Sequence, residues 1–349
     1  MLYDAVADLE LEIDRCDLTQ SGSETSSGFT RATTVVSLHG ENETGKGEDV
    51  TYDNDAHDVF ETMAQELAFS GTYKLDEFSD YISEVDLFFG EEPAQSIFHN
   101  YRRWAFESAA LDLALKQADT TLAEQLNREY HPVRFVVSTR LGDPPTGERI
   151  LDWLDRNPDL EFKLDPTSEW SDDLIARLAD TNAVRVLDLK GQYHGTTVDQ
   201  PADPELYTRV IDGFPDALIE DPALTDETEL LFDGSEERVT WDYPIRSVAT
   251  IENLPWEPTW LNIKPSRFGS VQALFETLDY CEQEGIRMFG GGQFELDVGR
   301  EHLHAIASLF YPDAPNDIAP AGYNDPEPQD DLPTSPLGAP DNPRGLEWN

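Results

Sequence analysis

The chain has 349 residues, is 39% hydrophobic and carries a formal net charge of −47. This length allows one barrel with additions or more than one domain, and the apolar content allows a full-sized core. The acidic residues are spread along the chain, and no basic stripe is present to meet phosphate, so nucleic acid and anionic membranes are disfavoured as partners. Such a surface is typical of a halophile-like protein, since concentrated salt screens its self-repulsion.

The compartment is predicted from what the chain lacks. It begins Met-Leu-Tyr-Asp-Ala-Val-Ala-Asp, without the basic and apolar stretches of a signal peptide. No run approaches the ~18 apolar residues of a membrane span. Cys16 and Cys281 are too few for a disulfide framework or a cysteine metal cluster. We therefore expect a cytoplasmic protein.

Residues 1–130 are predicted to form a mixed α+β domain. Apolar and polar residues alternate in two segments, which predicts half-buried strands over 5–13 and 31–38. The composition between Gly40 and Gly47 indicates a polar turn. Apolar residues at three- and four-residue spacing then predict three helices, over 57–69, 75–88 and 94–117.

From residue 131 to 323, apolar strands alternate with amphipathic helices. Eight strands are predicted, over 133–138, 160–164, 183–189, 217–220, 238–241, 260–263, 286–289 and, weakly, 317–319. Helices are predicted between them, over 147–156, 171–179, 203–213, 270–284 and 298–309. This repeat favours a parallel barrel over an open doubly wound sheet. Residues 324–349, rich in Pro and Asp, are predicted to form an extended tail on the surface.

A charged residue stands at or beside the end of four of the predicted barrel strands: Asp188, Glu220, Asp242 and Lys264. They lie 32, 22 and 22 residues apart, roughly one strand-loop-helix unit each time. A charge at the end of a buried strand is unfavourable unless it meets a metal, a partner or a substrate. All loops of a barrel converge on one end, here called the mouth. Because Mg²⁺ prefers carboxylate oxygens, the three acids predict a magnesium site at the mouth, facing a lysine base.

Three of the six lysines of the chain, Lys163, Lys190 and Lys264, fall at predicted strand ends. In an eight-stranded barrel, the strands that carry Lys163 and Lys264 stand on opposite walls. Their ammonium groups can therefore reach both faces of the α-carbon of a metal-bound carboxylate. A lysine that is buried or close to a cation can act as a base near neutral pH.

Several segments resemble the enolase superfamily, nearest its muconate-lactonizing and o-succinylbenzoate synthase-like branch. Thr44-Gly-Lys-Gly-Glu48 resembles the glycine-glutamate turn of that family's capping domain, and residues 107–116 resemble the helix that leads into the barrel. Phe294-Glu-Leu-Asp-Val-Gly-Arg300 resembles the seventh-strand segment. The resemblance implies a (β/α)7β TIM-like barrel with an N-terminal α+β capping domain. Within the last segment, Glu295 is expected near the mouth as a substrate-binding residue.

The resemblance also covers the charged strand ends. Asp188, Glu220 and Asp242 fall on the family's three metal-ligand positions, and Lys264, in Asn-Ile-Lys-Pro-Ser-Arg-Phe-Gly, falls on its sixth-strand lysine. Enolase-superfamily sites use a lysine or histidine base with Mg²⁺. The implied chemistry is abstraction of a proton α to a carboxylate, through an enediolate held by the metal. The implied assembly is a homo-oligomer.

Two departures from the family's pattern concern the bases. The second strand of the family carries Lys-x-Lys, but this chain reads Lys163-Leu-Asp165, so an aspartate stands where the usual base would be. Lys190 stands two residues past the first metal ligand, where asparagine is usual. Strand alternation places Lys190 on the face of Asp188, where it can replace the missing lysine or compete with the metal.

Three hypotheses follow for the function. The first is a magnesium-dependent enzyme that acts on a small-molecule carboxylate, with Lys264, Lys163, Lys190 and Asp165 as candidate acid-base groups. Two bases suit racemisation, epimerisation or cycloisomerisation, and one base with a β-leaving group suits dehydration. The second is a catalytically silent homologue that binds only a metabolite or a metal. The third is a protein-interaction scaffold, for which the sequence identifies no foreign partner.

Overall fold

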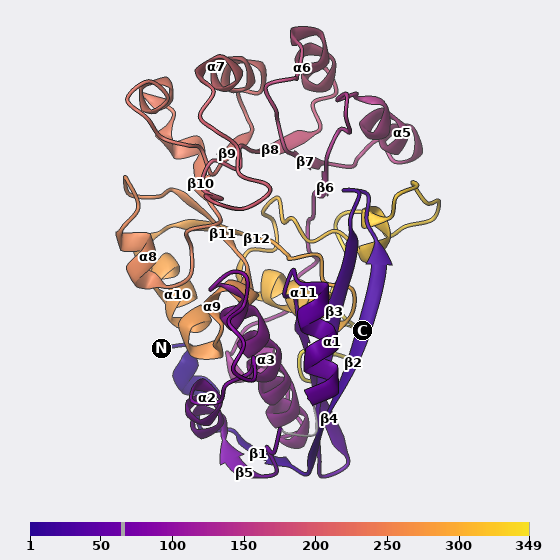
Figure 1. Ribbon diagram of the computed structural model, residues 1–349, viewed down its shortest axis with the longest axis vertical. Coiled ribbons are helices and arrows are strands. Elements are labelled where there is room, and N and C mark those ends of the chain that lie inside the picture. The colour runs from indigo at the N-terminus through magenta and orange to yellow at the C-terminus, as the bar shows by residue number, and fades with distance from the viewer. Residues whose placement is uncertain (64–66, 349) are drawn as a thin grey trace.

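The structure is a computed structural model and describes residues 1–63 and 67–348. Figure 1 shows a barrel built from the second half of the chain and, beside it, a sheet and helices built from the first half. The predicted TIM-like barrel with an N-terminal α+β capping domain is confirmed. Among the described helices, none has both the length and the apolarity needed to cross a membrane.

The barrel wall is a parallel sheet of seven strands in the order β12-β11-β10-β9-β8-β7-β6. Two parallel bridges, Phe135 to Asn316 and Gly291 to Asp317, link its first and last strands through residues 316–317. These residues occupy the place of the eighth strand. The seven strands are β6 (Val137–Thr139), β7 (Phe162–Leu164), β8 (Val184–Asp188), β9 (Leu218–Glu220), β10 (Val239–Trp241), β11 (Trp260–Ile263) and β12 (Arg287–Gly290).

The predicted eighth strand, 317–319, is reduced to these bridges, because side-chain hydrogen bonds of Asn316 replace some of the backbone hydrogen bonds of a strand. The Asn316 amide nitrogen donates to the carbonyl oxygen of Arg134 (2.9 Å), and its amide oxygen accepts from the backbone N–H of Gly290 (2.6 Å). This one residue therefore joins the two edges of the sheet. Its position brings the next residue, Asp317, to the mouth.

Helices cover the outside of the barrel (Figure 1). Four of them begin where a side chain accepts the backbone N–H three residues on: Ser171 for Leu174, Asp203 for Leu206, Ser247 for Thr250 and Ser270 for Ala273. The helices are α5 (Glu148–Arg156), α6 (Asp172–Ala179), α7 (Pro204–Gly213), α8 (Val248–Glu252), α9 (Pro265–Phe268), α10 (Val271–Glu284) and α11 (Val298–Phe310).

The N-terminal part packs two small sheets against the long helix α3 (Phe98–Gln117), which is buried over most of its length. An antiparallel sheet contains β2 (Arg15–Glu24), β3 (Thr30–Gly40) and β4 (Glu43–Asp49), and a second pairs β1 (Glu10–Ile13) with β5 (Gly71–Lys74). The remaining helices are α1 (Asn54–Met63), α2 (Leu75–Ser83) and α4 (Leu122–Gln125).

Several predictions for this part were wrong in detail. The strand predicted over 5–13 begins only at Glu10, because Tyr3 and Val6 are buried together by a short 3-10 helix over Tyr3–Ala5. The predicted turn over 40–47 is confined to residues 41 and 42, and a strand follows it. β2 was not predicted, since only half-buried side chains alternate along it. The helix predicted over 57–69 is α1, and residues 64–66 of that prediction lie outside the described residues.

Gly45 and Gly47 allow β4 to lie directly on α3. A Cβ atom at Gly45 would stand 2.1 Å from the carbonyl oxygen of Ala109, and one at Gly47 would stand 2.0 Å from that of Ala105. The close approach brings the next residue, Glu48, to helix α11, where its carboxylate accepts the backbone N–H of Gly299 (2.8 Å). The glycines thus position the N-terminal sheet against the barrel.

We expect the Gly47→Ala variant to be destabilised by about 1–3 kcal/mol, because the added methyl group forces a strand and a helix apart in a packed core. The measurement is the free energy of unfolding by denaturant titration. Gly338→Ala is the matched control, since a Cβ at Gly338 meets no atom within 4 Å. Equal stability of the two variants would contradict this account of the glycines.

The C-terminal segment returns over both parts of the molecule. Leu337 bridges Val133 at the start of the barrel, and Gly345 bridges Thr121 after α3. Leu346 is buried, and its backbone N–H donates to Asp112 of α3 (2.9 Å). The segment therefore fastens the barrel side of the molecule to α3.

Candidate active site

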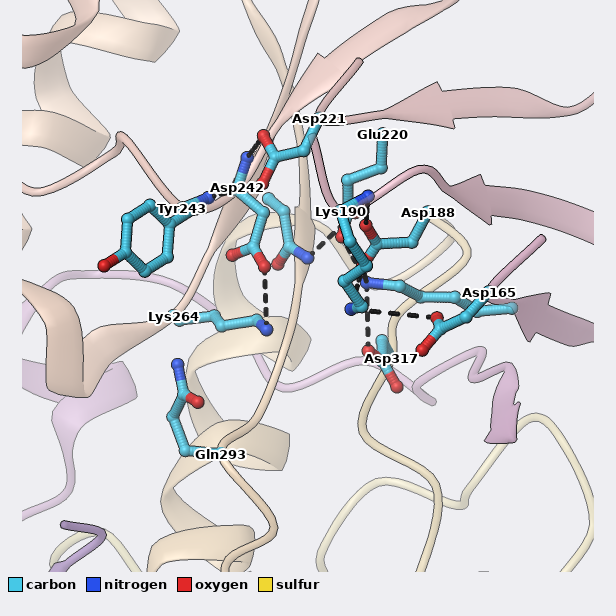
Figure 2. A network of polar contacts seen from close by, with 12 residues as sticks. Asp165, Asp188, Lys190, Glu220, Asp221, Asp242, Tyr243, Lys264, Gln293 and Asp317 are labelled. Atoms are coloured by element: carbon cyan, nitrogen blue, oxygen red, sulfur yellow. Dashed lines mark hydrogen bonds and ion pairs between the residues drawn. The ribbon is translucent and has the colours of Figure 1, made fainter. Parts of the chain in front are cut away.

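Three carboxylates end consecutive strands of the barrel. Asp188 is the last residue of β8, Glu220 is the last residue of β9, and Asp242 follows β10. All three are fully buried, and each offers an oxygen within 4.8 Å of the other two. The predicted spacing of one charged residue per strand unit therefore brings the acids together at the mouth (Figure 2).

Two of the predicted lysines contact this triad from one side. The Lys163 ammonium forms an ion pair with Glu220 and lies 3.3 Å from Asp188 and 3.3 Å from Asp317. The Lys190 ammonium forms an ion pair with Asp188 and lies 3.7 Å from Asp165. These ion pairs link the five charged residues predicted on this side into one network.

On the other side of the triad, three donors share one oxygen of Asp242. Lys264 lies 2.9 Å from Oδ2, Arg267 lies 3.3 Å from it, and the Tyr193 hydroxyl donates to it at 2.7 Å. Lys264 follows β11, and Arg267 belongs to the short helix α9 that begins directly after it. In Figure 2 the Lys264 side chain extends toward Asp242 from the side opposite Lys190 and Asp165. Lys264 therefore lies on one side of the triad, and Lys163 and Lys190 lie on the other.

The pKa values of the carboxylates reflect how their neighbours compensate burial. Burial raises the pKa of Asp188, but the ammonium groups of Lys190 and Lys163 outweigh it and hold that pKa below its usual range. Burial, together with the charges of Asp188 and Asp242, raises the pKa of Glu220 well above its usual value, despite Lys163. Three carboxylates this close resist ionising together unless further positive charge is supplied.

Asp221 adds to the negative charge behind the triad. It is fully buried, and its carboxylate accepts the backbone N–H of Asp242 (2.9 Å) and of Tyr243 (2.8 Å). Burial and the charges of Asp242 and Asp188 raise its pKa to about 7. Asp221 therefore orients the backbone that carries Asp242 and places its own carboxylate behind that of Asp242.

The donor set suits a hard divalent cation. Hard cations prefer carboxylate and carbonyl oxygens. The Oδ1 atom of Asp242 and the Oδ1 atom of Asn262 are buried and have no hydrogen-bond partner among residues 1–63 and 67–348. The ion pairs and hydrogen bonds link six carboxylates to five cationic groups, Arg140 included, so the cluster keeps an excess of one formal negative charge when all are ionised. A divalent cation would meet this excess.

Glu295, predicted near the mouth as a substrate-binding residue, lies beside Gln293. Its carboxylate accepts the backbone N–H of Gln293 (2.9 Å), and it is buried. The structure does not bring it into the ion-pair network of the triad within the described residues. Asp165 is placed at the mouth, where it also pairs with Arg140 at 3.4 Å.

Several members of the site were not predicted. Asn262, whose amide donates to Glu220 (3.1 Å), stands two residues before Lys264, so strand alternation could have found it. Arg267 stands in the segment that carries Lys264, and Asp221 directly follows Glu220. Tyr193 comes from the loop after β8, where no local pattern points to it.

Two family models match the chain. One, described as "Domain of unknown function (DUF8230) C-terminal domain", matches residues 129–325, and its N-terminal counterpart matches residues 4–125. No curated protein matches the chain significantly.

Solved structures with this fold are members of the enolase superfamily. A member from Listeria innocua shares 19% identity at a TM-score of 0.71, over 96% of this chain and 93% of that one. A dipeptide epimerase from Methylococcus capsulatus, complexed with a magnesium ion, shares 16% identity at a TM-score of 0.66, over 88% and 89%. Muconate lactonizing enzyme shares 19% identity at a TM-score of 0.63, over 88% of each chain. At these identities the likeness shows the fold.

Proposed function

The chain belongs to the DUF8230 family, whose two domains are described as being of unknown function, and from this premise and its enolase-superfamily fold we propose that it is a magnesium-dependent isomerase of a small carboxylate. The observation that carries the proposal is the buried triad of Asp188, Glu220 and Asp242, with an ammonium group on each side. Structures with this fold include epimerases and a cycloisomerase. Isomerisation, rather than elimination, is therefore the favoured outcome.

Asp188, Glu220 and Asp242 would hold the ion. Mg²⁺ would supply positive charge that stabilises the charge developing on the substrate carboxylate as its α-proton leaves. Lys264 removes or returns a proton at Nζ on one wall, and Lys163 does so on the other. Arg267 and Tyr193 hold the Asp242 carboxylate in place by donating to its Oδ2 atom.

The test is exchange of the α-proton in D₂O, followed by NMR over a panel of acid sugars, dipeptides, N-acyl amino acids and succinylbenzoate precursors. Magnesium-dependent uptake of deuterium by one class of compound is expected. Exchange together with inversion or ring closure would identify an isomerase, whereas loss of a β-substituent would identify a lyase. Absence of exchange from every compound would contradict the proposal.

A catalytically silent homologue is the second candidate, and one observation favours it. The Lys190 ammonium is paired with Asp188, one of the three carboxylates that would hold the metal. Binding of magnesium without proton exchange on any compound would support this candidate.

We also propose that the acidic surface is an adaptation to concentrated salt. With a net charge of −47, the folded chain repels itself, and at about 1 M salt screening acts over ~3 Å. We expect the melting temperature to rise as KCl is increased from dilute to molar concentration. Glycerol at matched osmolarity is the control, because it does not screen charge. A melting temperature that is unchanged or falls with KCl would contradict this proposal.

The remaining proposals concern the assembly of the protein, its compartment and its partners. We propose a homo-oligomer in the cytoplasm with a small-molecule substrate and with neither nucleic acid nor a membrane as a partner. Light scattering on the purified protein tests the assembly.

A further inference from the structure

Lys190 engages both carboxylate oxygens of Asp188. It stands two residues after Asp188 in the left-handed region, with a φ of 54°. Its backbone N–H donates to Oδ1 (3.1 Å), and its ammonium forms an ion pair with Oδ2. Left-handed backbone is uncommon for a residue other than glycine and is retained where the surroundings impose it. The turn therefore directs the ammonium back onto the carboxylate.

The two lysines on Asp188 differ in how firmly they are held. Lys163 is 1% exposed and pairs with Glu220 and Asp317 as well as with Asp188. Lys190 is nearer the solvent, with a side chain that is 13% exposed. Its second acceptor, Asp165, lies 3.7 Å away. A further cation at Asp188 would therefore displace Lys190 rather than Lys163, because Lys190 is more exposed and has Asp165 as a second acceptor.

A cavity of about 230 Å³ lies beside Lys190. Asp165 and Arg140 line it together with Lys190, and Leu141, Trp170 and Val198 form apolar wall. The ammonium can therefore leave Asp188 toward Asp165 without displacing a packed side chain.

We propose that Lys190 is a tethered counter-ion: it neutralises Asp188 in the metal-free protein, and a divalent cation displaces it to Asp165. The inference rests on the proposed magnesium site. It assigns one role to two residues, since Asp165 receives the ammonium that Lys190 withdraws. Lys190 and Asp165, the two departures from the family pattern, then act together. They lower the affinity for the metal, and in the metal-free protein Lys190 compensates the negative charge of the triad.

A counter-ion at Lys190 predicts that the Lys190→Gln variant binds Mg²⁺ more tightly but is less stable without the metal. Without the ammonium, Mg²⁺ no longer competes for Asp188, and we expect its dissociation constant to fall by about 10- to 100-fold, the scale of one charged hydrogen bond. In the metal-free protein the same variant leaves Asp188 less compensated, so its melting temperature should fall below that of the wild type. A residue that only stabilises the fold would lower the melting temperature without tightening the metal.

The experiment is calorimetric titration of MgCl₂ into the full chain, with melting temperatures of the metal-free proteins. Asp165→Asn should weaken Mg²⁺ about tenfold where Lys190 is present, and by much less in the Lys190→Gln background. Arg140→Gln is the matched control: it removes a positive charge from the same cavity, and its guanidinium is 45% exposed and pairs with Asp165. It should change the affinity far less than Lys190→Gln does.

The outcomes separate the inference from the function on which it rests. Equal magnesium affinities in the wild type and Lys190→Gln would overturn the counter-ion and leave the magnesium site standing. An equal effect of Asp165→Asn in both backgrounds would overturn Asp165 as the receiving group. If neither the wild type nor any variant binds Mg²⁺, the metal site and the counter-ion are both wrong.

Discussion

Replacing Lys264 by alanine is expected to lower the rate of magnesium-dependent α-proton exchange by roughly 10²- to 10⁴-fold, the contribution of a positioned acid-base group. Lys264 is 6% exposed and supplies the ammonium on the Asp242 side of the triad, 2.9 Å from Oδ2. Arg267 and Tyr193 still donate to the same oxygen in the variant, so Asp242 keeps partners and the fold should persist. The measurement is deuterium uptake by NMR on the compound that the wild type exchanges.

Two further variants show whether a proton or a charge is lost. Lys264→Arg keeps a cation beside Asp242 but cannot give up a proton, so it should be as slow as the alanine variant. Lys74→Ala removes a half-exposed lysine that pairs with Asp8 in the N-terminal part, and it should exchange at the rate of the wild type. An alanine variant at Lys264 that exchanges at full rate would rule out this lysine as the base.

Replacing Lys116 by methionine is expected to destabilise the fold by about 3–5 kcal/mol, because it leaves a buried carboxylate without its cation. The Lys116 ammonium, on α3, lies 2.8 Å from Asp112 and 2.7 Å from Glu347 and donates to the carbonyl oxygen of Thr44 (3.0 Å). Asp112 is 1% exposed. For a chain of this size we expect the melting temperature to fall by roughly 4–7 °C, measured by calorimetry.

A double-mutant cycle isolates the ion pair. Adding Asp112→Asn to the Lys116→Met variant removes the uncompensated charge, while the amide oxygen can still accept a backbone N–H such as that of Leu346. The double variant should therefore recover part of the lost stability. A double variant less stable than Lys116→Met would show that Asp112 does not depend on Lys116.

The barrel and its charged strand ends could be predicted because each strand-loop-helix unit leaves a local pattern, repeated along the chain. The gathering of Asp188, Glu220 and Asp242 then follows from topology, since neighbouring parallel strands end side by side. Asp165 and Lys190 were identified as departures from a family pattern, and they meet because they lie just after the ends of β7 and β8, which pair side by side.

What could not be predicted depends on partners far away in the sequence. Tyr193 lies in a loop and reaches Asp242 only because β8 and β10 stand close in the barrel. Asn316 replaces a strand by side-chain hydrogen bonds, which leave no alternation to recognise. In the N-terminal part, Gly45 and Gly47 suggested a turn, whereas they serve the contact between a strand and α3.

The C-terminal segment has a consequence for synthesis on the ribosome. Lys116 lies in a helix made early, whereas Glu347 follows it 231 residues later. At roughly 5–20 residues per second, tens of seconds pass before that partner emerges. During this interval the end of α3 has neither Glu347 nor the covering Leu346. The final packing of the N-terminal part therefore waits for a segment made more than 200 residues later.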